Sequence, residues 1–239
     1  MINWDHSGQS FIVAFDGHTG AQRWRLERDE VTSWSTPIIT VHAGRPQLIV
    51  NGTSRLRGYD LETGEVIWQC GGLSANVVAS PVAGDGMVFA ASSYDTRALL
   101  AIRLDGAVGD ITGTDRVAWT RIRGTPYVPS PLLYDGMLYF LRHYQGILTR
   151  VVARTGAEPS GPFRLEGIRN VYASPIGAAG RLYITSLDGV TLVLTNTEEP
   201  QILGMNRLDD RFSASAAAVG DALYLRGERY LYCISESLK

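Results

Sequence analysis

The chain has little cysteine, and the two cysteines stand in a pattern that carries no known sulfur chemistry. Cys70 and Cys233 lie 163 positions apart in 239 residues. This spacing matches neither a metal-binding nor a redox motif. We therefore expect two small thiols buried in the core, and the cysteines leave the redox compartment open.

A surface charge of one sign is also lacking. The formal net charge is −2, with 22 basic residues set against 24 acidic ones that are interspersed among them. This balance does not favour nucleic acid or an anionic membrane as a partner. No apolar run approaches the roughly 18 residues of a membrane span, and the N-terminal residues lack the pattern of a signal peptide. We expect no membrane span.

What the chain does have is a repeat. A polar stretch, a Ser-Pro or Thr-Pro pair, a strand pattern, a glycine turn and another strand pattern recur five times. The residues in the proline place are Pro37, Pro81, Pro131, Pro175 and Ala216. Their spacings are 44, 50, 44 and 41 residues, a period that is typical of propellers and other repeat folds.

Each period predicts antiparallel hairpins, because alternating Val, Leu, Tyr and Phe flank turns such as Gly84-Asp85-Gly86. Helix signals are nearly absent. Four strands in each unit, stacked on neighbouring units, predict an all-β propeller of four-stranded antiparallel blades, with about five blades present in one domain over residues 1–239. The expected divisions are a partial blade at 1–30, repeats near 31–74, 75–124, 125–168 and 169–210, and an incomplete blade at 211–239.

A second sequence motif ends each repeat. The segments from Ala14 to Trp24 and from Gly58 to Trp68 both follow [AG]-x-D-x-x-T-G-x-x-x-W. Asp and Thr can bond the turn backbone, Gly supplies a positive φ, and Trp offers a flat surface to a neighbouring blade. The residues given this structural role are Asp16, Gly20, Trp24, Asp60, Gly64, Trp68 and Trp119.

This pattern resembles the tryptophan-docking repeat of pyrroloquinoline-quinone (PQQ) type β-propellers. That family holds quinoprotein dehydrogenases and the propeller lipoprotein that assists outer-membrane protein assembly. Two copies of the motif are nearly perfect, and the other three depart from it. An insertion precedes Trp119 in one copy, Val152 replaces the expected Asp in the next, and residues 193–200 keep neither Thr-Gly nor Trp. The resemblance implies a bacterial protein whose full-length form is exported to a periplasmic or extracytoplasmic location.

The ends of the chain fall inside repeat units. Residues 2–24 supply parts of three strands, and residues 213–235 supply three strands without a fourth. We expect a ring of seven or eight blades of which two or three lie upstream. Alternatively, residues 20–25 supply the outer strand of the last blade and close a five-bladed ring. A closed ring predicts a monomer.

In a propeller, the loops between second and third strands share a face with the segments that lead into first strands. Here these loops are rich in aromatic, amide and arginine side chains, whereas the opposite face has short turns. We place a protein or small-ligand site on this loop-rich face. The candidate residues are Arg55, Tyr94, Asp95, Arg97, Tyr127, Arg142, His143, Tyr144 and Asn170. The competing interpretation of each is ordinary solvated surface, with Asp95 beside Arg97 as a local ion pair.

Catalytic signals are missing. His143 has no sequence-adjacent nucleophile or carboxylate, and no nucleophile elbow, zinc-binding pair or phosphate loop occurs. The acidic, glycine-rich stretch from Asp105 to Asp115 does not alternate its carboxylates as a calcium loop does, so we interpret it as an insertion between third and fourth strands. No residue is assigned to catalysis or to a metal.

Three functions remain open. The favoured one is a non-catalytic binding or scaffold module without cofactor. The alternative, implied by the resemblance, is a quinoprotein dehydrogenase of alcohols or sugars that uses PQQ and calcium. Against it, the chain has no adjacent cysteine pair and no alignable calcium ligands. A third is a carbohydrate-active propeller, for which the available carboxylates are Asp5, Asp95, Asp188 and Glu228.

Overall fold

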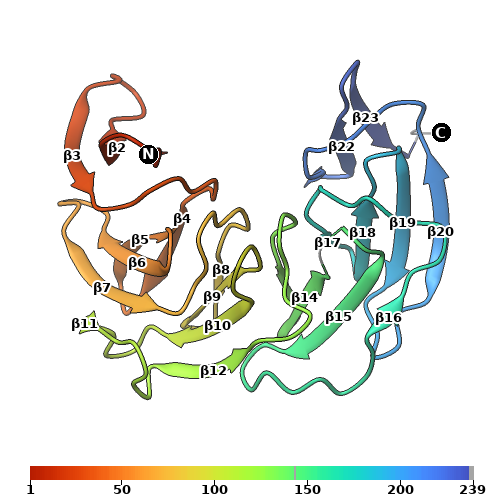
Figure 1. Cartoon of the computed structure of the whole chain (residues 1–239). Coiled ribbons are helices and arrows are strands. Elements are labelled where there is room, and N and C mark those ends of the chain that lie inside the picture. The colour runs from red at the N-terminus through yellow and green to blue at the C-terminus, as the bar shows by residue number, and fades with distance from the viewer. Residues whose placement is uncertain (143, 237–239) are drawn as a thin grey trace. The chain divides into compact units, whose positions relative to one another are not determined.

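The computed structural model of the chain describes residues 1–142 and 144–236. All 23 regular elements in these residues are β-strands (Figure 1), which confirms the predicted all-β class. The described residues contain no helix that is long and apolar enough to cross a membrane. The strands form six sheets, which are grouped in two compact units. Each unit is described by itself.

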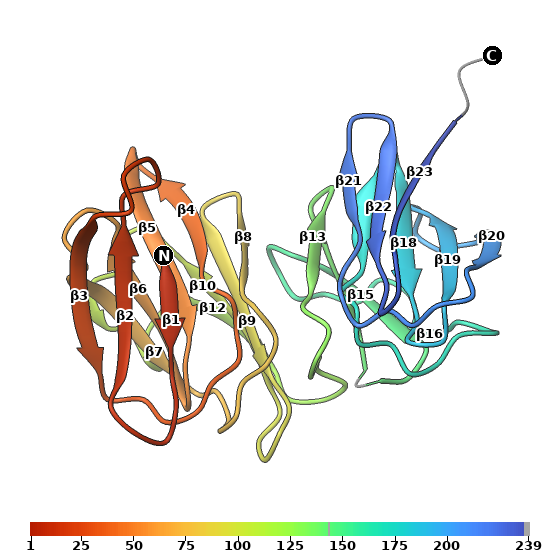
Figure 2. The ribbon, with the colours of Figure 1, turned by 90° about the horizontal axis from the view of Figure 1, so that it is seen from above.

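The first unit contains residues 1–127 and 154–156. Its strands are β1 (Ile2–Trp4), β2 (Ser10–Phe15), β3 (Gln22–Arg28), β4 (Ile38–His42), β5 (Arg45–Asn51), β6 (Arg55–Asp60), β7 (Val66–Gly71), β8 (Val82–Gly84), β9 (Met87–Ser92), β10 (Ala98–Arg103), β11 (Gly109–Asp110) and β12 (Val117–Arg121). They form sheets of order β1-β2-β3, β11-β7-β6-β5-β4 and β12-β10-β9-β8. Figure 2 shows the three strands of the first sheet side by side.

The second unit contains residues 128–153 and the chain from residue 157 onward. Its strands are β13 (Leu132–Tyr134), β14 (Met137–Leu141), β15 (Ile147–Val152), β16 (Phe163–Arg164), β17 (Ile176–Ala178), β18 (Arg181–Thr185), β19 (Val190–Thr195), β20 (Ile202–Arg207), β21 (Ala217–Val219), β22 (Ala222–Arg226) and β23 (Leu231–Ser235). They form two four-stranded sheets, β13 to β16 and β17 to β20, and a three-stranded sheet, β21 to β23, each in chain order.

Two-residue turns join the first and second strands of four sheets. Both residues of each turn have positive φ, as a type I′ turn requires, and this turn matches the twist of a tight antiparallel hairpin. The turns are Ala43-Gly44, Asp85-Gly86, Asp135-Gly136 and Ala179-Gly180. The sequence therefore sets the register of these hairpins locally.

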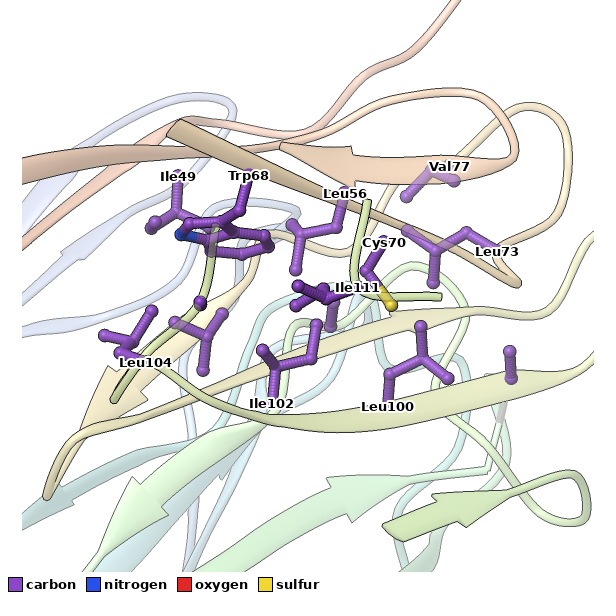
Figure 3. Close-up of a cluster of buried hydrophobic side chains, with 14 residues drawn as sticks. Ile49, Leu56, Trp68, Cys70, Leu73, Val77, Leu100, Ile102, Leu104 and Ile111 are labelled. Carbon is purple, nitrogen blue, oxygen red and sulfur yellow. The ribbon is translucent and has the colours of Figure 1, made fainter. Parts of the chain in front are cut away.

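The core of the first unit lies between its sheets. Figure 3 shows Trp68 and Leu56 of the second sheet opposite Ile102 and Leu100 of the third. All four belong to one cluster of buried side chains. The Trp68 side chain is fully buried, and its Nε1 donates a hydrogen bond to Gln47 Oε1 at 2.9 Å. Burial of this apolar surface is the main term that holds the sheets together.

The first residue of each tryptophan motif is small because it lies opposite the tryptophan on the adjacent strand. Ala14 pairs with Trp24, Gly58 with Trp68 and Ala101 with Trp119 across adjacent strands, and the register shifts directly after each pair. At Gly58 a Cβ would stand 2.3 Å from Trp68 Nε1. The indole therefore lies over the backbone of the neighbouring strand, and a larger residue would displace it.

The Ser-Pro and Thr-Pro pairs form a second repeated feature, which we call the hydroxyl ladder. The N–H of Thr36 donates to Ser80 Oγ, that of Ser130 to Ser174 Oγ, and that of Ser174 to Ser215 Oγ, each at 2.9 Å. The residue before the proline place in one sheet thus donates to the hydroxyl at the same place in the next. The hydroxyl links the first strands of neighbouring sheets.

One expectation, on the cysteines, is corrected. Cys70 is buried as expected, but Cys233 is exposed because β23 lies at the edge of a three-stranded sheet. Residues 22–28 form β3, which pairs with β2. The stretch after Arg103 lies between β10 and β12, as predicted for an insertion between third and fourth strands, and it also adds β11, which pairs in parallel with β7 with Gly109 opposite Trp68.

Candidate binding face

In each unit, backbone hydrogen bonds tie the loops between second and third strands to the segments that lead into first strands. In the first unit, Ser54 donates its N–H to Ser74 O at 3.0 Å and accepts from Leu73 at 3.1 Å. In the second unit, Leu187 donates its N–H to Asn170 O at 2.9 Å. These loops therefore share one face in each unit, as predicted for a propeller.

Trp34 is the most exposed large aromatic side chain on this face of the first unit. It keeps 64% of its surface exposed, yet its Nε1 donates to Asn76 Oδ1 at 2.6 Å and its backbone N–H donates to Val77 O at 2.8 Å. Asn76 itself has φ of +52°, which Asn tolerates better than most residues. The indole is exposed but held in one orientation, so a partner would not have to order it.

The candidate aromatic residues are paired in space. In the first unit, the Tyr94 and Tyr127 rings stack with centroids 6.4 Å apart, and Tyr94 is 60% exposed. In the second unit, Tyr144 and Tyr172 stack at 4.5 Å. Each pair joins a loop between second and third strands to a segment that leads into a first strand, which the sequence alone did not predict.

The charged and amide candidates have varied surroundings. Arg55 is half-buried and lies 3.4 Å from Asp29, whereas Arg97 is exposed. Asp95 accepts the N–H groups of Ala75 and Thr96 at 3.2 and 2.7 Å, so its carboxylate ties its own loop to the segment that leads into β8.

In the second unit, Arg142 is exposed, and its backbone bonds Gln145 and Ile147 at 3.0 Å each. Asn170 has a φ of +55°, a backbone conformation that Asn adopts more readily than most residues. The backbone geometry therefore accounts for an Asn at this position. His143 lies outside the described residues.

A buried charge network lies behind this face in the first unit, and only two of its members, Asp5 and Arg55, are among the residues singled out from the sequence. Arg28 and Asp5 form a bidentate pair at 2.9 and 3.2 Å, with both side chains at most 1% exposed. Arg28 also donates to the Tyr59 hydroxyl, and Ser33 Oγ donates to Asp5 Oδ2 at 2.6 Å. Asp5 is therefore fully engaged and unavailable for catalysis.

Glu30 continues the network toward the second sheet. Its Oε1 accepts from Arg57 at 3.0 Å, and a Cβ on Gly52 would stand 2.6 Å from its carboxyl carbon. Burial raises the pKa of Glu30, against the opposing effect of Arg28 and Arg57. No sequence signal marked this network, because β6 reads RLRGYD with polar and apolar residues mixed, and only the structure shows that Arg57 is buried near its centre.

A polar pocket of about 430 Å³ lies in the second unit, and Asp188, Asp210 and Glu228 are among its lining residues. Asp210 accepts N–H groups from Arg211, Arg229 and Tyr230 at 2.8 to 3.3 Å. Glu228 pairs with Arg211 at 3.2 Å. Asp210 and Glu228 are thus engaged with backbone donors and with Arg211, and these contacts order the loops around the pocket.

In the described residues, no group of three or more His, Cys, Asp or Glu side chains is placed to hold a metal ion. The stretch from Asp105 to Asp115 is engaged elsewhere: Asp110 Oδ1 accepts the Thr112 N–H at 2.9 Å, and Asp115 pairs with Arg116 at 2.8 Å.

Comparison with known proteins supports the fold. Residues 8–237 match the family model described as outer membrane protein assembly factor BamB. The crystal structure of BamB from Moraxella catarrhalis is similar over 96% of this chain and 82% of that chain, with 18% identity and a TM-score of 0.56. The computationally designed protein Ika8 is similar over 98% of this chain and 70% of that chain, with 13% identity and a TM-score of 0.66.

At these identities the two structures show the fold alone. None of the curated proteins compared with the chain matches it. The family match and the fold together confirm the predicted PQQ-like β-propeller and its resemblance to the outer-membrane assembly propeller.

Proposed function

The chain belongs to the family of the outer membrane protein assembly factor BamB, and we propose that it is a non-catalytic scaffold that binds a protein partner through its loop-rich face. The family name supports a partner among the proteins that assemble the outer membrane, and a periplasmic location. The proposal needs no cofactor.

The observation that carries the proposal is Trp34, an exposed indole fixed by hydrogen bonds to Asn76 and Val77. Exposed Trp, Tyr and Arg side chains dominate binding energy at protein interfaces. Rigid aromatic groups lose little conformational entropy when a partner covers them. In the same unit Tyr94 stacks on Tyr127, and Arg97 is exposed at the end of the same loop.

The experiment is a quantitative binding assay with purified outer-membrane assembly proteins of the source bacterium, with the chain immobilised. We expect one of them to bind saturably, and Trp34→Ala with Arg97→Ala to weaken that binding at least about tenfold, as loss of hot-spot residues does. Val66→Ala, an exposed substitution at the start of β7, is the control and leaves affinity unchanged.

Equal affinity of the double variant and the parent would overturn the chosen face. No saturable binding to any assembly protein would overturn the proposed class of partner. Saturable binding of PQQ with calcium by the same preparation would move the quinoprotein alternative to the front.

A further inference from the structure

The outer strand of the fifth sheet, β20, has a free edge. This sheet has the four strands of a complete unit, in the order β17-β18-β19-β20, and β20 pairs with β19 and with no other strand of the described residues (Figure 1). Every residue of β20 except Gly204 is exposed, and the strand carries one charged residue, Arg207, at its end. Its outer edge therefore offers unpaired backbone donors and acceptors.

The outer strands of the other four-stranded sheets and of the first sheet are protected in different ways. β3 carries four charged residues in seven positions. β7 has no charged residue, but β11 pairs with its outer edge. On β12 only Thr120 is exposed, and β16 has only two residues. Proteins protect sheet edges by charge, by cover and by shortness, so an edge that is long, apolar and uncovered indicates a place where another strand pairs.

Two side chains of β20 form an exposed apolar patch. Leu203 and Met205 are 56% and 52% exposed. A Cβ on Gly167, which follows β16, would stand 2.3 Å from Met205 Cε, so Met205 is turned toward the fourth sheet, β13 to β16. Leu203 shares this face because side chains two positions apart on a strand point the same way. The two residues of β16 are too few to cover the patch.

Exposed charges of opposite sign mark the two ends of this edge. Glu199 lies just before β20, and Arg207 ends it. Both side chains are exposed, and neither forms an ion pair in the described part of the chain. Two β20 strands that run antiparallel bring the acidic end of one to the basic end of the other. The edge is therefore complementary to itself, as an interface with two-fold symmetry requires.

We propose that the free edge of β20 binds the same edge of a second copy of this chain, in an antiparallel strand pair with Leu203 on the two-fold axis. Residues directly opposite each other in such a pair share a face, so Leu203 and Met205 of both copies join in one apolar patch. Glu199 of one copy lies opposite Arg207 of the other, because both are four positions from Leu203. The two sheets then continue into each other across the axis.

A second copy is inferred because one two-fold contact satisfies the charges at both ends of the strand and the apolar patch between them. Such a dimer differs from the monomer expected of a closed ring. Ring closure covers the faces of the sheets but leaves their outer edges open. The inference does not use the loop-rich face and stands apart from the proposed function.

The test is sedimentation equilibrium of the purified chain over a range of concentrations, where we expect a reversible equilibrium between monomer and dimer. Leu203→Lys should abolish the dimer, because it places two like charges at the axis. Glu199→Arg and Arg207→Glu should each weaken the dimer at least about tenfold, since each turns both attractive charge contacts into repulsive ones. The backbone amides of β20 should exchange hydrogen more slowly as the dimer forms.

Combining the two charge reversals tests the register. The double variant Glu199→Arg with Arg207→Glu should recover the dimer, because opposite charges again face each other. An equimolar mixture of the two single variants should form a heterodimer, because each variant supplies the charges that the other lacks. Arg181→Glu, a charge reversal at the exposed start of β18, is the matched control and should leave the dimer unchanged.

A chain that stays monomeric up to about 1 mM, or a dimer that Leu203→Lys leaves intact, would overturn the proposal. So would a mixture of the single variants that pairs no better than either variant by itself. A monomeric parent whose β20 amides become protected when an outer-membrane assembly protein is added would identify a different protein as the occupant and overturn the assignment to a second copy. The thermal unfolding of every variant is measured alongside and should match that of the parent, because the substituted side chains are exposed.

Discussion

The indole of Trp24 lies on the backbone of Gly64 in the next sheet. A Cβ on Gly64 would stand 2.8 Å from Trp24 Cε3, and Trp24 Nε1 donates to Leu61 O at 3.1 Å. Gly64 belongs to the second copy of the motif in which Trp24 ends the first. One copy of the motif thus supplies the tryptophan, and the next copy supplies the glycine on which that tryptophan packs.

Gly64→Ala should destabilise the chain by about 2–3 kcal/mol, because alanine would meet both an unfavourable positive φ and the Trp24 ring. Gly20→Ala is the matched control, since Gly20 has φ of +72° against +80° at Gly64 and no neighbour within 4 Å. Urea unfolding of both variants isolates the ring contact. Equal losses would mean that Trp24 docking contributes nothing.

The stability of the chain should fall between about pH 4 and pH 2, partly through Asp60. Hydrogen bonds from Arg45, then from the backbone of Thr63, lower the pKa of Asp60 from 3.8 to about 2. Because the folded pKa lies below the unfolded one, the stabilisation is present above pH 3.8 and lost as pH falls through about 2. In Asp60→Asn the unfolding midpoint should depend less on pH in this window, and an unchanged dependence would contradict the assignment.

Arg28→Met should destabilise the chain by about 3–5 kcal/mol, because it leaves buried Asp5 without its cation. Adding Asp5→Asn should recover part of the loss, since the orphaned charge is then gone. Arg25→Met on the same strand is the control: Arg25 is exposed and rests on the Phe11 ring, and its loss should cost less than about 1 kcal/mol. Chemical unfolding of the four proteins decides whether the network is needed.

The two cysteines should differ in reactivity with a thiol reagent. Burial, and next the Asp110 charge, raise the pKa of Cys70 to about 11, whereas Cys233 is exposed. One thiol per folded chain should react quickly at pH 8 and the second only in denaturant, and Cys233→Ser should remove the fast phase. Fast reaction of both thiols would show that the sheet around Cys70 opens.

Asn76→Gly should release the Trp34 indole without unfolding the chain, because glycine accepts the positive φ but offers no acceptor. The Trp34 indole N–H signal, identified among the five tryptophans by Trp34→Phe, should exchange faster with solvent in Asn76→Gly. Unchanged exchange would mean that Asn76 does not fix the ring, and the argument for a preorganised anchor would fail.

Local patterns predicted most of the fold. The Asp-Gly and Ala-Gly turns predicted hairpins because two-residue turns with positive φ specify antiparallel pairs without help from the rest of the chain. The repeated motif predicted stacked sheets because Trp, Gly and Asp recur at fixed places. The loop-rich face followed from strand order, but the partners of its side chains did not: nothing near Trp34 in sequence indicates Asn76, 42 positions away.

The sequence by itself determined the strand period, the turns, the small residue opposite each tryptophan and the family, because each depends on residues close together in the chain. Only the tertiary structure decided the pairing of Arg28 with Asp5, the parallel strand that the insertion adds to β7 and the exposure of Cys233. These features depend on which sheet edges and loop ends meet. Burial and pairing between distant segments leave no periodic trace in a single sequence.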